Sequence, residues 1–147
     1  MNYEIVTLEE KIVVGAAAQT GNQEPDMQQV IGGLWGQLYG GIIGNIRERA
    51  NEYAIGLYSD YNDSKDNYTV TVGCEVKENK NPELAVKVIP AGRYAKFSIH
   101  GDMVKAVADT WQEIWSTDLK RTYTGDFEEY VSHDGNEADI NIYIAVE

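Results

Sequence analysis

The stretch MQQVIGGLWGQLY, from Met27 to Tyr39, is followed 76 positions later by MVKAVADTWQEIW, from Met103 to Trp115. Four large side chains repeat in register between them: Met27, Ile31, Trp35 and Tyr39 match Met103, Val107, Trp111 and Trp115. Steps of four residues place each set on one face of an amphipathic helix. The repeat therefore indicates an internal duplication, with one helix in each half.

Short apolar runs flank both helices. In the first half, residues 4–19 read as strand, turn and strand, and a strand pair spans 53–58 and 68–76. In the second half, the predicted pairs join 84–89 to 94–100 and 126–132 to 138–146. We expect an α+β fold in one domain, residues 1–147, built from repeats at approximately 1–78 and 79–147. Each β-β-α-β-β repeat adds to an antiparallel sheet, and a central cleft lies at the pseudo-two-fold axis.

Two local features concern the predicted helices. Asp26 with Gln29 predicts a capping box at the first helix, and Asp102 predicts a cap at the second. The first helix also carries a glycine every fourth residue: Gly32, Gly36, Gly40 and Gly44. We favour the interpretation that this stripe lets the helix approach the sheet closely, and the alternative is a bare wall beside a ligand cavity.

Composition limits the classes of partner. The 147 residues have a net charge of −12, which disfavours direct binding to nucleic acid or anionic lipid. The segment 126–147 carries seven acidic residues and no Lys or Arg, so it attracts cations. Ten Tyr and three Trp against two Phe suit a half-wet cavity better than a sealed core.

Cysteine and histidine are scarce. Cys74 is the single cysteine and lies on the apolar face of its strand, so we expect a small core residue. His100 and His133 fall at a strand end and in a turn, where we expect surface residues. We therefore predict no metal and no organic cofactor. The lone cysteine and the absence of a secretory leader favour the cytoplasm, and the polar, glycine-rich character of 27–46 argues against a membrane span.

Several motifs resemble the gyrase-inhibitor-like (GyrI-like) effector-binding superfamily, which also occurs in AraC-type and other bacterial transcription activators. They are Ile89–Phe97 (IPAGRYAKF), Thr110–Trp115, Phe127–Tyr130 (FEEY) with Ile140–Val146, and, in the first half, Gly56–Tyr61 (GLYSDY) and Tyr68–Gly73 (YTVTVG). The likeness covers nearly the whole chain. It implies an SHS2-like fold and, with no room left for a helix-turn-helix domain, a stand-alone binder of small molecules.

The resemblance implies that Glu128 lies in a ligand pocket that takes cations and that Tyr143 is an aromatic residue of the same pocket. Strand alternation agrees in part, because it places Glu128 and Tyr130 on one face and Glu129 on the other. Asn141 and Tyr143 share a face of the next strand, which makes Tyr143 a candidate cross-strand neighbour of Glu128. A carboxylate among aromatic rings suits a delocalised organic cation.

The other pocket candidates are aromatic: Trp35, Trp111, Trp115, Tyr39 and Tyr130, with Tyr58 and Tyr94 as weaker ones. The tryptophans and Tyr39 repeat across the duplication on apolar stripes, so core packing is an equal alternative.

Three functions remain open. The favoured one is an effector- or drug-binding protein that captures amphipathic cationic or polycyclic ligands. The second is a hydrolase of strained, cyclopropane-type electrophiles, as the resemblance suggests for some members, with Glu128 as general base. The third is a protein-interaction module like the gyrase inhibitor, whose partner would be gyrase or a regulator. We favour binding over catalysis, since no classical catalytic set is present.

Overall fold

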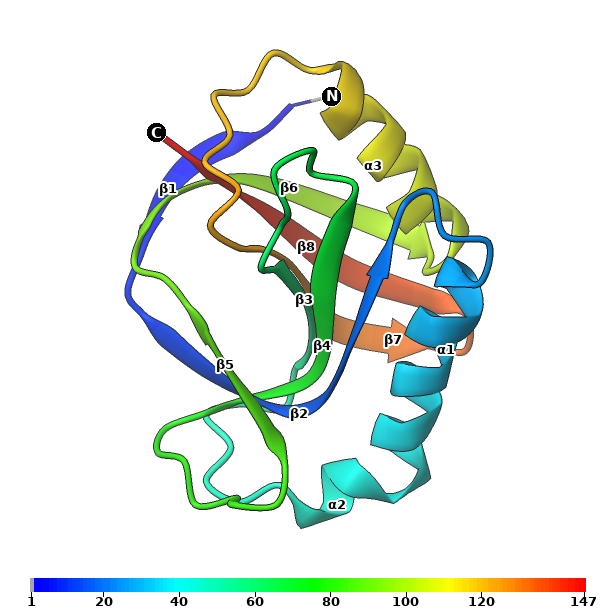
Figure 1. Ribbon diagram of the computed structural model, residues 1–147, viewed down its shortest axis with the longest axis vertical. Helices are drawn as coiled ribbons and strands as arrows, with labels where there is room; N and C mark the ends of the chain where they lie inside the picture. Colours follow the sequence, from blue (N-terminus) through cyan, green and yellow to red (C-terminus); the bar gives the residue numbers. More distant parts are fainter. Residues whose placement is uncertain (1) are drawn as a thin grey trace.

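The computed structural model describes residues 2–147 except the side chain of His133, so the predicted surface position of that histidine lies outside the described residues. Eight strands form one antiparallel sheet in the order β1-β6-β8-β7-β3-β4-β2-β5 (Figure 1). The strands are β1 (Glu4–Leu8), β2 (Lys11–Gly21), β3 (Ala54–Ser59), β4 (Asn67–Val76), β5 (Ala85–Ile89), β6 (Gly92–Asp102), β7 (Asp126–Asp134) and β8 (Glu137–Val146). The helical segments follow β2 and β6, as the duplication predicts.

The strand order has two-fold pseudo-symmetry. Exchanging β1 with β5, β2 with β6, β3 with β7 and β4 with β8 gives the same order read backwards. The β3–β7 pair lies at its centre and marks the pseudo-two-fold axis. The predicted α+β class and duplicated topology are confirmed, and the predicted division near residue 78 falls between β4 and β5.

The sheet curls because its outer strands form two long ribbons that pair with each other. β1 and β2 make one bent ribbon, and β5 and β6 make the other. Pairing runs from Glu4↔Lys96 to Leu8↔Gly92 and resumes from Lys11↔Ile89 to Gly15↔Ala85. The predicted pairing of 84–89 with 94–100 is therefore wrong. β5 pairs with β2 and β6 pairs with β1, so the chain continues from β5 into β6 instead of folding back on itself.

The first helical segment begins where predicted but without its predicted cap. α1 (Met27–Gln37) continues through a π-helical turn, η1 (Leu38–Ile42), into α2 (Ile43–Asn45). Asp26 is the N-cap residue at φ −100° and ψ 11°, not the extended conformation from which N-cap side chains reach the helix, and it makes no capping hydrogen bond. The predicted capping box is wrong.

The second helix has Val104 as its N-cap residue, and the predicted cap, Asp102, lies two residues earlier and bonds to the first turn. α3 (Lys105–Ser116) begins after Asp102, whose Oδ1 accepts hydrogen bonds from the backbone N–H groups of Val104 at 3.1 Å and Lys105 at 2.8 Å. These bonds satisfy donors that the first turn of a helix leaves free.

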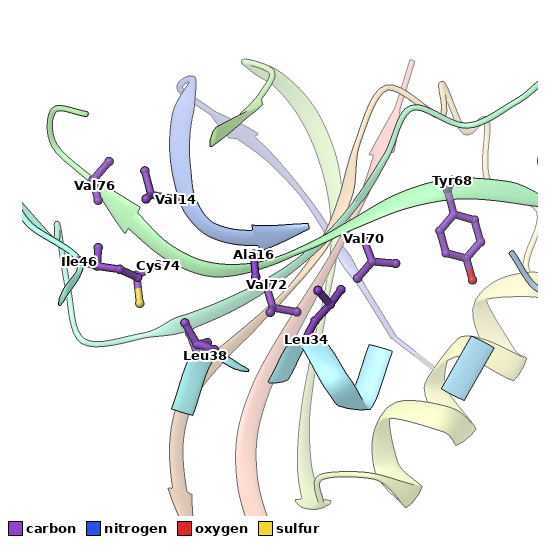
Figure 2. Close-up of a cluster of buried hydrophobic side chains, with 11 residues drawn as sticks. Val14, Ala16, Leu34, Leu38, Ile46, Tyr68, Val70, Val72, Cys74 and Val76 are labelled. Carbon is purple, nitrogen blue, oxygen red and sulfur yellow. The ribbon is translucent and has the colours of Figure 1, made fainter. Parts of the chain in front are cut away.

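Both helices pack against the sheet, and Figure 1 shows them on the same side of the molecule. Leu34 and Leu38 of the first segment point toward the side chains of β4, including Cys74, which is fully buried as predicted (Figure 2). Ile114 of α3 packs with Phe97 and neighbouring residues of β6 and β8. A third apolar cluster occupies the other face of the sheet. Within residues 2–147, none of the helices combines the length and the apolar character needed to cross a bilayer.

The glycine stripe does not pack against the sheet. A Cβ added at Gly32, Gly36, Gly40 or Gly44 would meet no atom within 4 Å. Gly32 and Gly36 each lie two residues from Leu34, about 200° around α1, so they point away from the core, and all four glycines are exposed. The interpretation that the stripe allows close packing is wrong, and the glycines form an open helix face.

Candidate binding site

Glu128 lies at the centre of the sheet, opposite a glycine. It pairs with Gly56 of β3 and Ile142 of β8, and it is only 3% exposed. A Cβ at Gly56 would lie 3.4 Å from Oε1 of Glu128 and 3.1 Å from Cζ2 of Trp35. The missing side chain therefore leaves the space that the Glu128 carboxylate and the Trp35 ring use.

Three neutral donors hold the Glu128 carboxylate. The Trp111 indole N–H donates to Oε2 at 2.8 Å, and the Tyr58 hydroxyl donates to the same oxygen at 3.2 Å. The Tyr130 hydroxyl donates to Oε1 at 2.9 Å. These donors come from α3, β3 and β7, so the carboxylate ties the second helix to the middle of the sheet.

Aromatic rings enclose this carboxylate, and we call Trp35, Tyr58, Tyr68, Trp111 and Tyr130 the aromatic cage. Trp35 meets Tyr130 edge-on with 5.1 Å between ring centroids, and Tyr58 meets both Trp111 and Tyr68 edge-on at 5.5 Å. Edge-to-face contacts of this kind are favourable for aromatic pairs. The position where the sequence predicts a cleft is thus closed by side chains over Glu128.

Two exposed rings continue the aromatic cage to the surface. Tyr39 stacks on Trp35 with a centroid distance of 6.1 Å, and Trp115 lies 6.2 Å from Trp111. Both outer rings are 54% exposed. They occupy equivalent places in the two repeats, so one exposed ring borders the aromatic cage on each helix.

The Glu128 carboxylate has no ion-pair partner among the described residues. Burial raises the pKa of its carboxyl, and the hydrogen bonds from Trp111, Tyr130 and Tyr58 oppose that rise only in part. Burial and the neighbouring carboxylate also raise the pKa of Tyr58 and Tyr130, which keeps both phenols protonated as donors.

Asp126, two residues earlier on β7, is equally buried but has a cation beside it. The Arg121 guanidinium donates from Nη2 to Oδ2 at 2.7 Å. The Tyr61 hydroxyl donates to the same oxygen at 2.7 Å, and the backbone N–H of Ala145 donates to Oδ1 at 2.9 Å. Of two buried carboxylates on one strand, one is therefore neutralised and Glu128 is not.

The expectation that Tyr143 is a cross-strand neighbour of Glu128 is wrong. The register pairs Tyr143 with Phe127 and Glu128 with Ile142, so Tyr143 lies on the opposite face of the sheet. Its ring stacks on Phe127 with a centroid distance of 4.5 Å, and Tyr94 belongs to the same cluster. Alternation could not reveal this, because a shift of one residue in register reverses the face.

Glu129 faces away from Glu128, as alternation predicts. It pairs with Asn141, whose Nδ2 donates to Oε1 of Glu129 at 3.2 Å. Burial and the Glu129 carboxylate together raise the pKa of Tyr143 to about 12. Glu129 is therefore a nearby acid outside the aromatic cage.

The structure brings together most of the residues that the sequence singled out. Trp111 and Tyr130 contact Glu128 directly, Trp35 lies beside them, and Tyr39 and Trp115 form the exposed border. Sequence reasoning missed Gly56, Tyr68 and the Asp126–Arg121 ion pair, and it ranked Tyr58 too low. Strand alternation places Asp126 on the same face as Glu128, so this residue could have been found. Its partner Arg121 lies in the irregular connection after α3, where the sequence has no periodic pattern that would predict its position.

Known proteins match this chain along nearly its whole length. The sequence model of the Cass2 family, described as integron-associated effector binding protein, matches residues 4–146. The Bacillus subtilis protein YobU, named as a candidate transcriptional regulator, is 32% identical over 153 residues, which cover 97% of this chain and 96% of YobU.

Solved structures show the same fold. An integron cassette protein from the mobile metagenome of Vibrio cholerae is 28% identical with a TM-score of 0.80, and the match covers 99% of this chain and 95% of that one. SAV2435, solved bound to tetraphenylphosphonium, is 19% identical with a TM-score of 0.82, covering 100% and 94%. The resemblance to GyrI-like proteins is thereby confirmed, and the chain belongs to the Cass2 family of integron-associated effector-binding proteins.

Proposed function

We propose that this protein binds lipophilic organic cations whose charge is surrounded by aromatic groups, and that Glu128 supplies the opposite charge inside the aromatic cage. One observation carries the proposal: a buried carboxylate is held by three neutral donors, while the neighbouring buried carboxylate has its own arginine. Keeping a buried charge without a counter-ion is costly, so its presence indicates a cation that arrives from outside.

The ligand class follows from the lining. Aromatic faces attract cations through their quadrupoles, and a carboxylate in a water-poor site attracts them more strongly than one in water. The Glu128 oxygens already accept three hydrogen bonds, which favours a ligand that needs contact with charge and rings over one that needs many acceptors. Trp35, Trp111 and Tyr130 would contact such a ligand, with Tyr39 and Trp115 at the rim.

Access requires the rings to separate, since Glu128 is 3% exposed. Trp35 and Trp111 stand on different helices, so a ligand that enters between them changes the surroundings of both indoles. Binding should therefore alter tryptophan fluorescence. The relative solved with tetraphenylphosphonium supports this choice of probe, because that cation carries its charge at the centre of four phenyl rings.

The test is charge removal at Glu128. We expect Glu128→Gln to weaken tetraphenylphosphonium binding about ten- to thirtyfold, or about 1.4 to 2 kcal/mol, because the amide keeps the shape but loses the charge. The uncharged triphenylphosphine oxide should bind both proteins within about twofold of each other. Titration followed by tryptophan fluorescence and by calorimetry measures both.

Glu129→Gln is the matched control, since it removes the same charge one residue away on the other face of the strand. Its effect should be small and should disappear as salt rises, because it acts only at long range. Equal losses for Glu128→Gln and Glu129→Gln that vanish together in salt would show diffuse attraction by the acidic segment, and the proposal would fail.

Binding should also depend on pH. The pKa of Glu128 is raised by burial, so its carboxyl takes up a proton at a higher pH than an ordinary glutamate. As pH falls through this raised pKa, the site loses its charge and affinity for tetraphenylphosphonium drops, by up to about tenfold per pH unit below it. The probe has no titrating group, so a series from about pH 8 to about pH 5 reports the protein alone. A profile that is the same in Glu128→Gln would contradict this assignment.

A further inference from the structure

A cavity of about 440 Å³ lies beside the aromatic cage. It is formed between the start of α1, the connection that precedes it and the connection from β3 to β4, and its lining includes Thr20, Glu24, Asp26, Asp60, Asn62 and Tyr68. Tyr68 is the residue it shares with the aromatic cage. Figure 2 shows Tyr68 extending from β4 on the same side as Val70.

The lining is acidic and contains no Lys or Arg. Asp60 already has a counter-ion, since Lys87 Nζ lies 2.5 Å from its Oδ2. Glu24 and Asp26 form no ion pair within the described part of the chain. Asp26 stands at the start of a helix yet does not cap it, so its carboxylate remains available to a ligand. This charge excludes anions and attracts cations.

Thr20 adds a buried acceptor. It pairs with Tyr68 across β2 and β4, so both side chains lie on the face of the sheet where the cavity is. Thr20 is 6% exposed, and its hydroxyl oxygen has no hydrogen-bond partner among the described residues. An unpaired buried hydroxyl is costly, and a ligand with N–H groups would satisfy it.

We propose that this cavity binds a linear aliphatic polyamine. Its ammonium groups would meet Glu24 and Asp26, and its methylene chain would lie along Tyr68 and Val30. The Thr20 hydroxyl oxygen is buried, so the Thr20 side chain would rotate to accept a hydrogen bond from one N–H of the ligand. No group of three or more His, Cys, Asp or Glu side chains in residues 2–147 is placed to hold a metal ion. Carboxylates that do not converge on one point suit a cation whose charges are spread along a chain. This proposal does not depend on the function proposed for the aromatic cage.

Spermidine is the probe, and calorimetry at physiological salt is the measurement. The double variant Glu24→Gln/Asp26→Asn should weaken spermidine binding about tenfold or more, because it removes the two free carboxylates. Asp26 makes no capping hydrogen bond, so its replacement by Asn removes no bond from the start of the helix. The control Glu9→Gln/Glu10→Gln removes the same charge from exposed residues between β1 and β2 and should change affinity less than about twofold.

Two further variants locate the site. Thr20→Val leaves the net charge unchanged and should weaken spermidine binding about three- to tenfold through the lost hydrogen bond. Glu128→Gln should leave spermidine binding unchanged even where it reduces tetraphenylphosphonium binding. Equal losses in the two double variants, no effect of Thr20→Val, or loss of spermidine binding in Glu128→Gln would each overturn the proposal. Mg²⁺ binding with the same dependence on Glu24 and Asp26 would also overturn it, in favour of a divalent cation.

Discussion

Replacing Arg121 by Met is expected to destabilise the protein by about 3 to 5 kcal/mol, because it leaves Asp126 as a buried charge without a cation. The Asp126 side chain is 0% exposed and the Arg121 side chain 12%. Tyr61 and the backbone of Ala145 would still donate hydrogen bonds, but neither neutralises the charge. Urea unfolding followed by tryptophan fluorescence measures the change in free energy of unfolding.

A second substitution separates charge from packing. Arg121→Met/Asp126→Asn removes both charges, so it should lose less stability than Arg121→Met alone. The control is Lys105→Met, which breaks an exposed ion pair with Asp109 whose side chains are 78% and 64% exposed. That change should stay within about 0.5 kcal/mol. A loss below about 1 kcal/mol for Arg121→Met would show that Asp126 does not need its cation, and the contrast with Glu128 would lose its meaning.

Gly15→Ala should be the most damaging glycine substitution on β2, with a loss of about 3 kcal/mol or more. Gly15 pairs with Gly73 of β4, and a Cβ there would lie 1.9 Å from the backbone oxygen of Val72 and 2.7 Å from the Cα of Gly73. Backbone atoms cannot turn aside as side chains do, so the two strands would have to separate. Thermal unfolding and urea titration both report the loss.

Gly36→Ala makes the same chemical change, but we expect it to increase the stability of the protein. Nothing lies within 4 Å of a Cβ at Gly36, and alanine is the better helix former by about 1 kcal/mol. The variant should therefore gain up to about 1 kcal/mol in stability and keep its affinity for tetraphenylphosphonium. Destabilisation by Gly36→Ala would mean that the open helix face packs against something, and weaker binding would place that face beside the ligand.

In our proposal, the two buried carboxylates of β7 have different roles, because one contributes to stability and the other to ligand binding. Asp126 attaches the connection after α3 to the sheet through Arg121, whereas Glu128 holds its charge among neutral donors from α3, β3 and β7. The neutral donors keep the carboxylate oriented without cancelling its charge. A bound cation would complete the pairing that the fold itself leaves open.

The sequence by itself determined the duplicated topology, because that information is local and periodic. Met27–Tyr39 and Met103–Trp115 repeat at helical spacing, and the strands alternate with a period of two, so the order of elements and the shared face of Glu128 and Tyr130 follow from nearest neighbours in the chain. The family resemblance added the choice of Glu128 over Glu129.

Only the tertiary structure decided which side chains surround Glu128 and which carboxylate lacks a cation. Gly56, Tyr58 and Trp111 are distant from Glu128 in the chain and reach it through the β3–β7 pairing and the packing of α3, and Arg121 reaches Asp126 through an irregular connection. Tyr143 is a further example, because the actual register pairs it with Phe127 and not with Glu128. This difference of one residue places Tyr143 on the opposite face of the sheet. The register between strands depends on contacts between segments that are distant in the sequence, and burial and charge compensation depend on the same contacts. The local periodicity of a sequence contains no information about them.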